Sequence, residues 1–407
     1  MRSTPRAETF PAQTPAAAQV FTTVLSHGPL TRLEAGRRAG LSPAAVTKAV
    51  RPLLAAGYLV EGGDPAGGAG SGEGPVAEAR PVLGRPAGLV RVNGERALFI
   101  GVKATGDELI AVLTDLCCRV RLACRTPLPD RAAGPALASI ADLVHELLAH
   151  AAESGAPVAG LGIAVSGDVD RAEGAVRYSP FLDWRDVPLA ALAATACGLP
   201  VTVDNDVRAL TVAEQWFGAG AGLSDFAVVT VGAGIGCGLV VHGRVVAGAH
   251  GVAGEIGHLV VDPAGPPCHC GNRGCVEAIA GDAAIVARMR EVTGHQVPDR
   301  AAAVALAHQD LPGAREVYAR AGEAIGRGIA TVANLLGPER VIISGEGLAA
   351  YDLFAEQIRE AFTTAAFGSA ARCDVQTRPL PFEEWARGAA AVAIQTFITD
   401  NPARGKG

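Results

Sequence analysis

The stretch GEIGHLVVDPAGPPCHCGNRGCVE, from Gly254 to Glu277, is the most informative part of this chain. Cys268, Cys270 and Cys275 lie within eight residues, and the glycines among them let the backbone turn sharply enough for three thiolates to converge. His258, ten residues before the first cysteine, supplies a fourth ligand. A Cys₃His set is typical of a closed zinc site with a structural role, because no position is left for a catalytic water.

The alternative is a set of unrelated reduced cysteines. The N-terminus lacks the apolar core of a signal peptide, which predicts a cytoplasmic location where thiols stay reduced. The other six of the nine cysteines show no such clustering, and this favours the metal site. His269 lies inside the cluster but cannot easily share a metal with both of its neighbours, so the predicted ligand set omits it.

Length and composition limit the class of protein and the number of domains. A chain of 407 residues with 49% hydrophobic and 19% charged residues is globular and long enough for two or three domains. No run of about 18 residues is free of charges and helix breakers, so no membrane span is expected. Residues 1–93 hold 10 Lys+Arg against 6 Asp+Glu, whereas the remainder holds 25 against 35. A basic N-terminal part on an acidic body indicates a small module that binds a polyanion.

We expect residues 1–16 to be disordered and residues 17–93 to form a winged helix-turn-helix domain. Three short helices are predicted. The first ends at Gly28, the second begins with Thr31 and Glu34 as a capping box, and the third begins with Ser42 as its N-cap followed by Pro43.

The third helix has the pattern of a recognition helix. Val46, Val50, Leu53 and Leu54 form its buried stripe, with a bend expected at Pro52. On the opposite face lie Thr47, Lys48 and Arg51, which are predicted to contact DNA. The N-cap residue Ser42 belongs to the same predicted DNA-binding set.

Two predicted strands, YLVEGG and LVRVN, would form the wing of this domain. Between them, residues 62–88 contain 9 Gly and 4 Pro, which predicts a long flexible loop. Its GRP segment would place Arg85 in a minor groove. The alternative for the three helices is a dimerisation cap or a helical lid.

From Leu98 onward strands alternate with helices, which argues an α/β architecture. The spacing of the histidine, cysteines and glutamate between His258 and Glu277 resembles, without a gap, the signature of the ROK family of sugar kinases and sugar-responsive repressors. The resemblance extends from about residue 17 to about residue 398. It implies a two-lobed, actin-like (ribonuclease H-like) ATPase fold with a sugar between the lobes. In that family only the repressors carry an N-terminal winged helix.

The resemblance also implies domain boundaries and sugar ligands. Residues 94–206 would form the small lobe, completed by a C-terminal helix over 383–398, and residues 207–382 the large lobe with the zinc site. Asn205 would bind a sugar hydroxyl, and Asp206 would match the base that deprotonates the sugar in kinases. The other implied sugar ligands are Gly167, Glu255, His258 and Glu277. Without the resemblance, the run Asp204–Asp206 would indicate a turn or a helix cap.

The nucleotide side departs from the kinase pattern. ROK kinases have Asp-x-Gly-Gly-Thr after the first strand, and here Lys103, Thr105 and Asp107 stand at the Asp, first Gly and Thr positions. Lys103 thus places a cation where the kinases have the Asp that helps to hold the metal–nucleotide. The Asp107 carboxylate would repel the phosphates of a nucleotide. The glycine-rich run Thr230–Gly238 and the SGEG segment at 344–347 resemble the other nucleotide loops, although a tight turn would also explain such glycines.

These observations predict a sugar-responsive, DNA-binding regulator, most simply a repressor of carbohydrate metabolism, that performs no phosphotransfer. Its partners would be operator DNA, a sugar or sugar-phosphate effector and further copies of itself in a homodimer or homotetramer. Two alternatives remain: an ATP-dependent sugar kinase with an extra N-terminal domain, and a zinc-containing sugar-binding protein that does not bind DNA.

Overall fold

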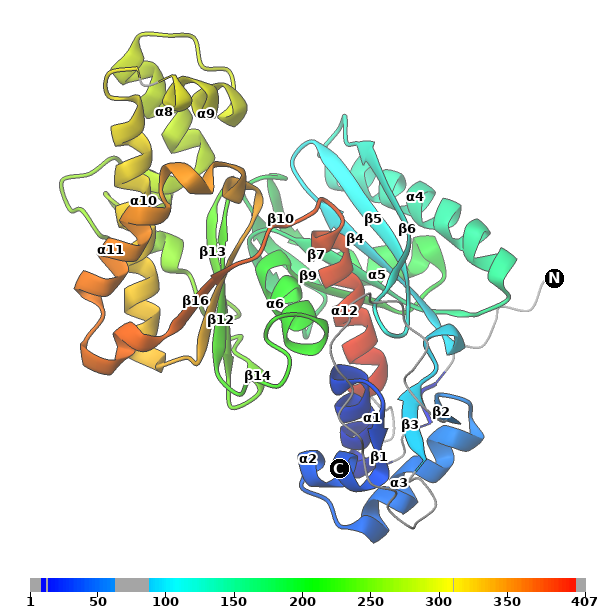
Figure 1. Ribbon diagram of the computed structural model, residues 1–407. Helices are drawn as coiled ribbons and strands as arrows, with labels where there is room; N and C mark the ends of the chain where they lie inside the picture. Colours follow the sequence, from blue (N-terminus) through cyan, green and yellow to red (C-terminus); the bar gives the residue numbers. More distant parts are fainter. Residues whose placement is uncertain (1–8, 12–13, 63–87, 310, 400–407) are drawn as a thin grey trace.

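The computed structural model describes residues 9–11, 14–62, 88–309 and 311–399. A small N-terminal module lies below a body of two lobes, each built on a five-stranded sheet (Figure 1). Within this part of the chain, no helix is both long and apolar enough to cross a membrane.

The N-terminal module combines three helices with a small sheet, which is consistent with the predicted winged helix-turn-helix. A three-stranded sheet in the order β1-β3-β2 accompanies three helices. The elements are α1 (Pro15–His27), β1 (Leu30–Thr31), α2 (Arg32–Ala39), α3 (Pro43–Ala55), β2 (Leu59–Gly62) and β3 (Leu89–Val92). The wing strands β2 and β3 pair antiparallel, as the sequence predicts, whereas the short strand β1 was not anticipated. Residues 63–87, with the predicted loop and Arg85, lie outside the described residues.

The predicted helix caps are confirmed. The Thr31 hydroxyl accepts a hydrogen bond from the Glu34 N–H, and the Ser42 hydroxyl accepts one from the Ala45 N–H at 3.3 Å. The Glu34 carboxylate does not complete the capping box, because it pairs with Arg37 and Arg38. Helix α3 continues through Pro52 to Ala55.

The expected disordered tail of residues 1–16 is too long. Helix α1 already begins at Pro15, where Thr14 caps it. Phe10 is buried and packs edge-on against Phe21 and Tyr58. An aromatic side chain of this size gains enough from burial to order its segment, a tertiary effect that the Ala- and Pro-rich composition conceals.

The first lobe contains a sheet in the order β11-β7-β4-β5-β6. Strands β11, β7 and β4 run parallel, while β5 and β6 are antiparallel neighbours. Its elements are η1 (Gly94–Arg96), β4 (Leu98–Ala104), β5 (Glu108–Asp115), β6 (Val120–Pro127), α4 (Ala133–Ser154), β7 (Val158–Val165), β8 (Asp168–Asp170), β9 (Ala175–Ser179), β10 (Trp184–Val187), α5 (Leu189–Cys197) and β11 (Val201–Asn205).

The second lobe has a sheet in the order β14-β13-β12-β15-β16 and a group of helices beside it, at the left of Figure 1. Its elements are α6 (Asp206–Phe217), β12 (Phe226–Val231), β13 (Ile235–Val241), β14 (Arg244–Val245), η2 (Ile256–His258), α7 (Val276–Ala280), α8 (Asp282–Thr293), α9 (Arg300–His308), α10 (Ala314–Leu336), β15 (Arg340–Ser344), η3 (Glu346–Leu353), α11 (Ala355–Ala365), η4 (Gly368–Arg372) and β16 (Asp374–Thr377).

The C-terminal helix α12 (Glu384–Thr399) joins the parts of the molecule. It packs on strands β4 and β7 of the first lobe and along α6 (Figure 1). Glycine is required where the helix meets the sheet, since a Cβ on Gly101 or Gly162 would come within about 2 Å of an α12 carbonyl oxygen.

The N-terminal module shares its hydrophobic core with the body. Phe397 of α12 contacts Phe10 and Tyr58 of the module on one side and Phe99 of β4 on the other, with ring centroids 5.4 to 6.1 Å apart. Buried residues of α1, α6 and α12 belong to the same hydrophobic cluster. The module is therefore packed against the lobes and is not a separate domain on a flexible linker.

Candidate functional site

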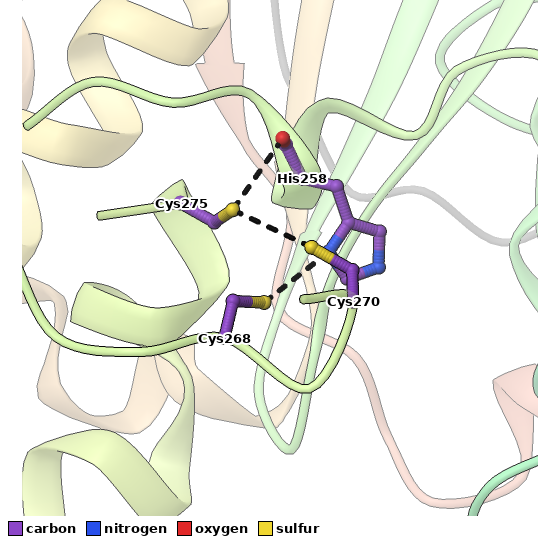
Figure 2. Close-up of side chains that lie close together, drawn as sticks. All are labelled: His258, Cys268, Cys270 and Cys275. Atoms are coloured by element: carbon purple, nitrogen blue, oxygen red, sulfur yellow. Dashed lines mark hydrogen bonds between the residues drawn. The ribbon is translucent and has the colours of Figure 1, made fainter. Parts of the chain in front are cut away.

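The predicted metal ligands come together in one loop (Figure 2). His258 ends η2, Cys275 is the N-cap residue of α7, and Cys268 and Cys270 lie on the turn between them. The Cys268 Sγ is 3.6 Å from His258 Nδ1, and the Cys270 Sγ is 3.7 Å from the Cys275 Sγ. All four ligand atoms lie within 4.8 Å of one another.

The separations of 3.6 Å and 3.7 Å match those around a tetrahedral metal ion. With Zn–S bonds near ~2.3 Å, ligand atoms at the corners of a tetrahedron stand about 3.5–3.8 Å apart. The residues present therefore suit a zinc ion. His269 stays outside this set, as predicted, and its Nε2 instead lies 2.8 Å from the Glu277 Oε1.

Asp206, the first residue of α6, is held by a buried cation. Its carboxylate forms an ion pair with the Lys103 ammonium, and only 5% of the Lys103 side chain and 10% of the Asp206 side chain are exposed. Ser166 donates to the same oxygen, and the Val207 N–H donates to the other. Burial alone would raise the pKa of Asp206, but the Lys103 charge and these hydrogen bonds outweigh it and lower that pKa.

Asn205 is the N-cap residue of α6. Its Oδ1 accepts hydrogen bonds from the Val207 and Arg208 N–H groups, and its Nδ2 donates to the Gly167 carbonyl at 3.0 Å. The helix-cap interpretation of the Asp204–Asp206 run is thus correct, and Gly167 lies beside Asn205. One Nδ2–H of Asn205 is left for a ligand.

Glu255 is close enough to His258, Glu277 and Asp206 for their charges to act on its pKa. Burial raises the pKa of Glu255, and the charges of Glu277 and Asp206 raise it further, against His258 and Arg208. Glu277, near the start of α7, accepts the Ile235 N–H at 3.0 Å. The structure therefore places Gly167, Asn205 and Asp206 together at the N-terminus of α6, and Glu255 and Glu277 at either end of the segment that carries His258 and the three cysteines.

The segments at the kinase nucleotide positions are closed on themselves. The Thr105 hydroxyl lies at hydrogen-bond distance, 2.9 Å, from both the Asp107 carboxylate and the Glu108 carbonyl. The polar groups of this turn between β4 and β5 therefore bind one another. In the second loop, a Cβ on Gly232 would stand 2.7 Å from the Glu346 carboxylate. Negative charge thus faces the glycine-rich loop.

On the winged helix, Thr47, Lys48 and Arg51 are exposed on one face of α3, opposite the buried Val46 and Val50. The Thr47 hydroxyl donates back to the Pro43 carbonyl at 2.9 Å. Leu54, predicted to be buried, is only partly so.

Comparison with known proteins identifies the family. Residues 99–396 match the model of the ROK family. The chain belongs to the ROK family. A "Xylose repressor" of Caldicellulosiruptor bescii is 28% identical over 363 residues, which cover 86% of this chain and 87% of that protein.

Both branches of the ROK family appear among the relatives. A crystal structure of a ROK family transcriptional regulator, described as a homologue of the Escherichia coli MLC protein, superposes with a TM-score of 0.76 at 26% identity over 94% of this chain and 96% of the other. A "Glucokinase" of Thermotoga maritima is 39% identical over 201 residues, 46% of this chain and 63% of that protein. The regulator match covers 94% of the chain and so extends into the N-terminal module, whereas the shorter kinase match covers less than half of the chain.

Sequence reasoning missed a network of charged side chains next to Asn205 and Asp206. Arg208 on α6 pairs with Asp204 and donates to the carbonyls of Val169 and Gly251, so it ties together β11, β8 and the loop after β14. Asp204 and Arg208 are four residues apart, a spacing that predicts an ion pair on a helix end.

This network borders a groove of about 1580 Å³ between α1, β8–β9, the loop 243–251 and the end of α12. None of the six predicted sugar residues, all of which the structure describes, lines this groove.

Proposed function

We propose that this protein is a DNA-binding transcriptional repressor that responds to a sugar and does not phosphorylate it. The observation that carries this is the buried ion pair between Lys103 and Asp206 in a chain that also has a winged helix. Regulators that match over most of the chain, named for xylose repression and as an MLC homologue, support the proposal.

The ion pair argues against phosphotransfer. A general base must accept the proton of the attacking hydroxyl, and a carboxylate whose pKa is lowered by a bound ammonium is a weaker base. ROK kinases have an Asp beside the metal–nucleotide at the position of Lys103. This chain therefore has no carboxylate at that position to hold the metal. Glu346 places a further negative charge against Gly232.

A sugar would bind through its hydroxyls. In this proposal Asp206, Glu255 and Glu277 accept hydrogen bonds from hydroxyl groups, and the remaining Nδ2–H of Asn205 donates one. Gly167 brings backbone close to the ligand, and His258 contributes from the edge of the metal loop.

Zinc would hold this site in shape. His258, Cys268, Cys270 and Cys275 would bind one ion, and the loop so fixed carries Glu255 and Glu277 within three residues of a ligand. The role is preorganisation of the sugar ligands and not activation of water.

Operator binding would use α3 in a major groove. Thr47, Lys48 and Arg51 are exposed there, Ser42 lies at the start of the same helix, and Arg85 belongs to the predicted wing loop. One recognition helix reads only a few base pairs, so a homodimer or a dimer of dimers would bind a two-fold operator.

The two sites would communicate through α6 and α12. Helix α6 begins at the sugar residues, and both helices share a core cluster with α1 of the winged helix. Closure of the lobes on sugar would therefore move the winged helices relative to each other and release the operator. By linkage, operator DNA weakens sugar binding by the same factor.

The second candidate is an ATP-dependent sugar kinase, which the glucokinase match favours. One experiment separates the two. The purified full chain is incubated with ATP, magnesium and a panel of sugars, and ADP release is measured alongside binding to DNA selected from a random-sequence library. Selected DNA that dissociates with sugar, without ADP release, supports the repressor; sugar-dependent turnover would revive the kinase.

A further inference from the structure

The two connections between the lobes meet at a buried carboxylate. The chain passes from the first lobe to the second directly between β11 and α6, and it returns from β16 to α12 through residues 378–383 (Figure 1). Glu214 lies on α6 with 2% of its side chain exposed, and it forms an ion pair with Arg378 of the returning segment at 2.5 Å. This ion pair therefore joins both connections.

Arg378 is fixed to the second lobe and reaches toward the first. Its N–H donates to the Ile343 carbonyl of β15 at 2.8 Å. Its guanidinium also lies 3.7 Å from the carboxylate of Glu384, the first residue of α12. Glu384 in turn pairs with Arg387 at 2.7 Å, and Arg387 donates to the Cys118 carbonyl between β5 and β6 at 3.0 Å. The charged side chains thus link the second-lobe sheet to the first lobe.

Glu214 also fixes the loop that follows α6. Its carboxylate accepts the Ala219 N–H at 2.8 Å, and its carbonyl accepts the Gly218 and Gly220 N–H groups at 3.2 and 3.1 Å. A Cβ on Gly218 would overlap both the Glu214 carboxylate and the Arg378 guanidinium. The loop therefore passes directly over the ion pair, and its position depends on that of the two charged groups.

The same loop borders the N-terminal module. A Cβ on Gly222 would lie 3.6 Å from the Nε2 of His27, the last residue of α1. Trp216, just before the loop, belongs to the same buried hydrophobic cluster as Val20 and Val24 of α1. A displacement of residues 218–222 would therefore reach α1 directly.

We propose that the Glu214–Arg378 ion pair transmits movement of the lobes to the N-terminal module. This inference rests on the proposed function and identifies the contact through which lobe closure reaches the operator-binding helices. Separating the pair would leave a buried carboxylate without its cation, so α6 and the β16–α12 connection move together. Glu214 and Arg378 are positioning residues, since they act through residues 218–222 and α1.

The first test is hydrogen–deuterium exchange of the full-length protein without ligand. Arg378→Met removes the partner of Glu214, so exchange in residues 218–222 and in the last turn of α1 becomes at least about threefold faster. Arg372→Met makes the same change on the exposed surface of η4 and leaves both segments as in the wild type. Faster exchange confined to residues 218–222, or no change, would overturn the inference, because the pair would then fix at most its own loop.

A gentler variant covers the case in which Arg378→Met does not fold. Glu214→Gln keeps an oxygen that accepts the Ala219 N–H and leaves no buried carboxylate unpaired. It is expected to speed exchange in the same two segments by a smaller factor. An unchanged exchange rate in the last turn of α1 would overturn the inference here too.

The second test measures the coupling between sugar and DNA. Calorimetry with D-glucose, D-xylose and N-acetyl-D-glucosamine gives the sugar affinity, and fluorescence anisotropy with the selected DNA gives the factor by which bound sugar weakens DNA binding. In Arg378→Met this factor falls at least about threefold, while the sugar affinity of the DNA-free protein stays within about twofold of the wild type.

The two tests separate this inference from the proposed function. A coupling factor that is the same in Arg378→Met and in the wild type overturns the inference and leaves the sugar-responsive repressor intact. Failure of every sugar to release DNA from the wild type contradicts the proposed function, and the exchange experiment then still decides whether the ion pair links the lobes to α1.

Discussion

Replacing Lys103 with Met removes the positive partner of a buried ion pair and leaves the Asp206 carboxylate behind. Both side chains are at least nine-tenths buried, and Asp206 keeps only Ser166 and the Val207 N–H as donors. Removing one member of such a pair costs about 3–5 kcal/mol of unfolding free energy. Lys48→Met, on the exposed face of α3, changes the same side chain at the surface and costs less than about 0.5 kcal/mol.

A double-mutant cycle isolates the pair. Urea unfolding at pH 7, followed by circular dichroism, compares Lys103→Met, Asp206→Asn and the double variant. Because the double variant leaves neither charge unpaired, its loss is smaller than the sum of the single losses by at least about 1 kcal/mol. Strict additivity would refute the ion pair.

The pH dependence of the unfolding free energy gives an independent test of the ion pair. In the wild type the pKa of Asp206 is lowered below its ordinary value of 3.8, so its stabilisation is present above that pH and is lost as the pH falls through the folded-state pKa. In Lys103→Met, burial is no longer opposed by the ammonium and raises that pKa. The deficit of the variant therefore shrinks between pH 7 and pH 4, and a deficit independent of pH would contradict this reasoning.

Three further predictions concern DNA, metal and helix α6. Lys48→Ala or Arg51→Ala weakens operator binding in fluorescence anisotropy: loss of a base contact costs about 1–3 kcal/mol, whereas loss of a phosphate contact mainly flattens the salt dependence. Unchanged affinity in both would argue against α3 as the recognition helix. Cys270→Ser lowers bound zinc below half an equivalent by elemental analysis while Cys373→Ser, outside the cluster, retains it; equal zinc in the two would remove the site. Asn205→Ala deletes the α6 cap and lowers the unfolding free energy by about 0.5–2 kcal/mol, and no loss in urea unfolding would argue against that cap.

Local signals allowed much of the fold to be predicted. Caps at Thr31 and Ser42 mark helix starts because side-chain oxygens satisfy free N–H groups there, and the cysteine spacing fixes the metal loop. The family resemblance implied a two-lobed fold, but the strand order of each sheet was not predicted, because strand pairing between distant segments leaves no local pattern.

The sequence did not reveal the interactions made between distant segments. Lys103 and Asp206 are 103 residues apart, and their pairing depends on how β4 and α6 meet. Phe10 is buried only because Phe397, at the other end of the chain, covers it. Composition predicted disorder for the segment that contains Phe10. Comparison with the kinase motif predicted only that Lys103 replaces a metal-side anion, whereas the structure also gives Lys103 a carboxylate partner.

The most direct test of the central claim follows operator occupancy and ADP release in one sample. Full-length protein bound to selected, fluorescently labelled DNA is titrated with the sugar that calorimetry identifies, in the presence of ATP and magnesium. The account predicts that the anisotropy falls to that of free DNA while no ADP forms. Sugar-dependent ADP release with unchanged anisotropy would contradict it.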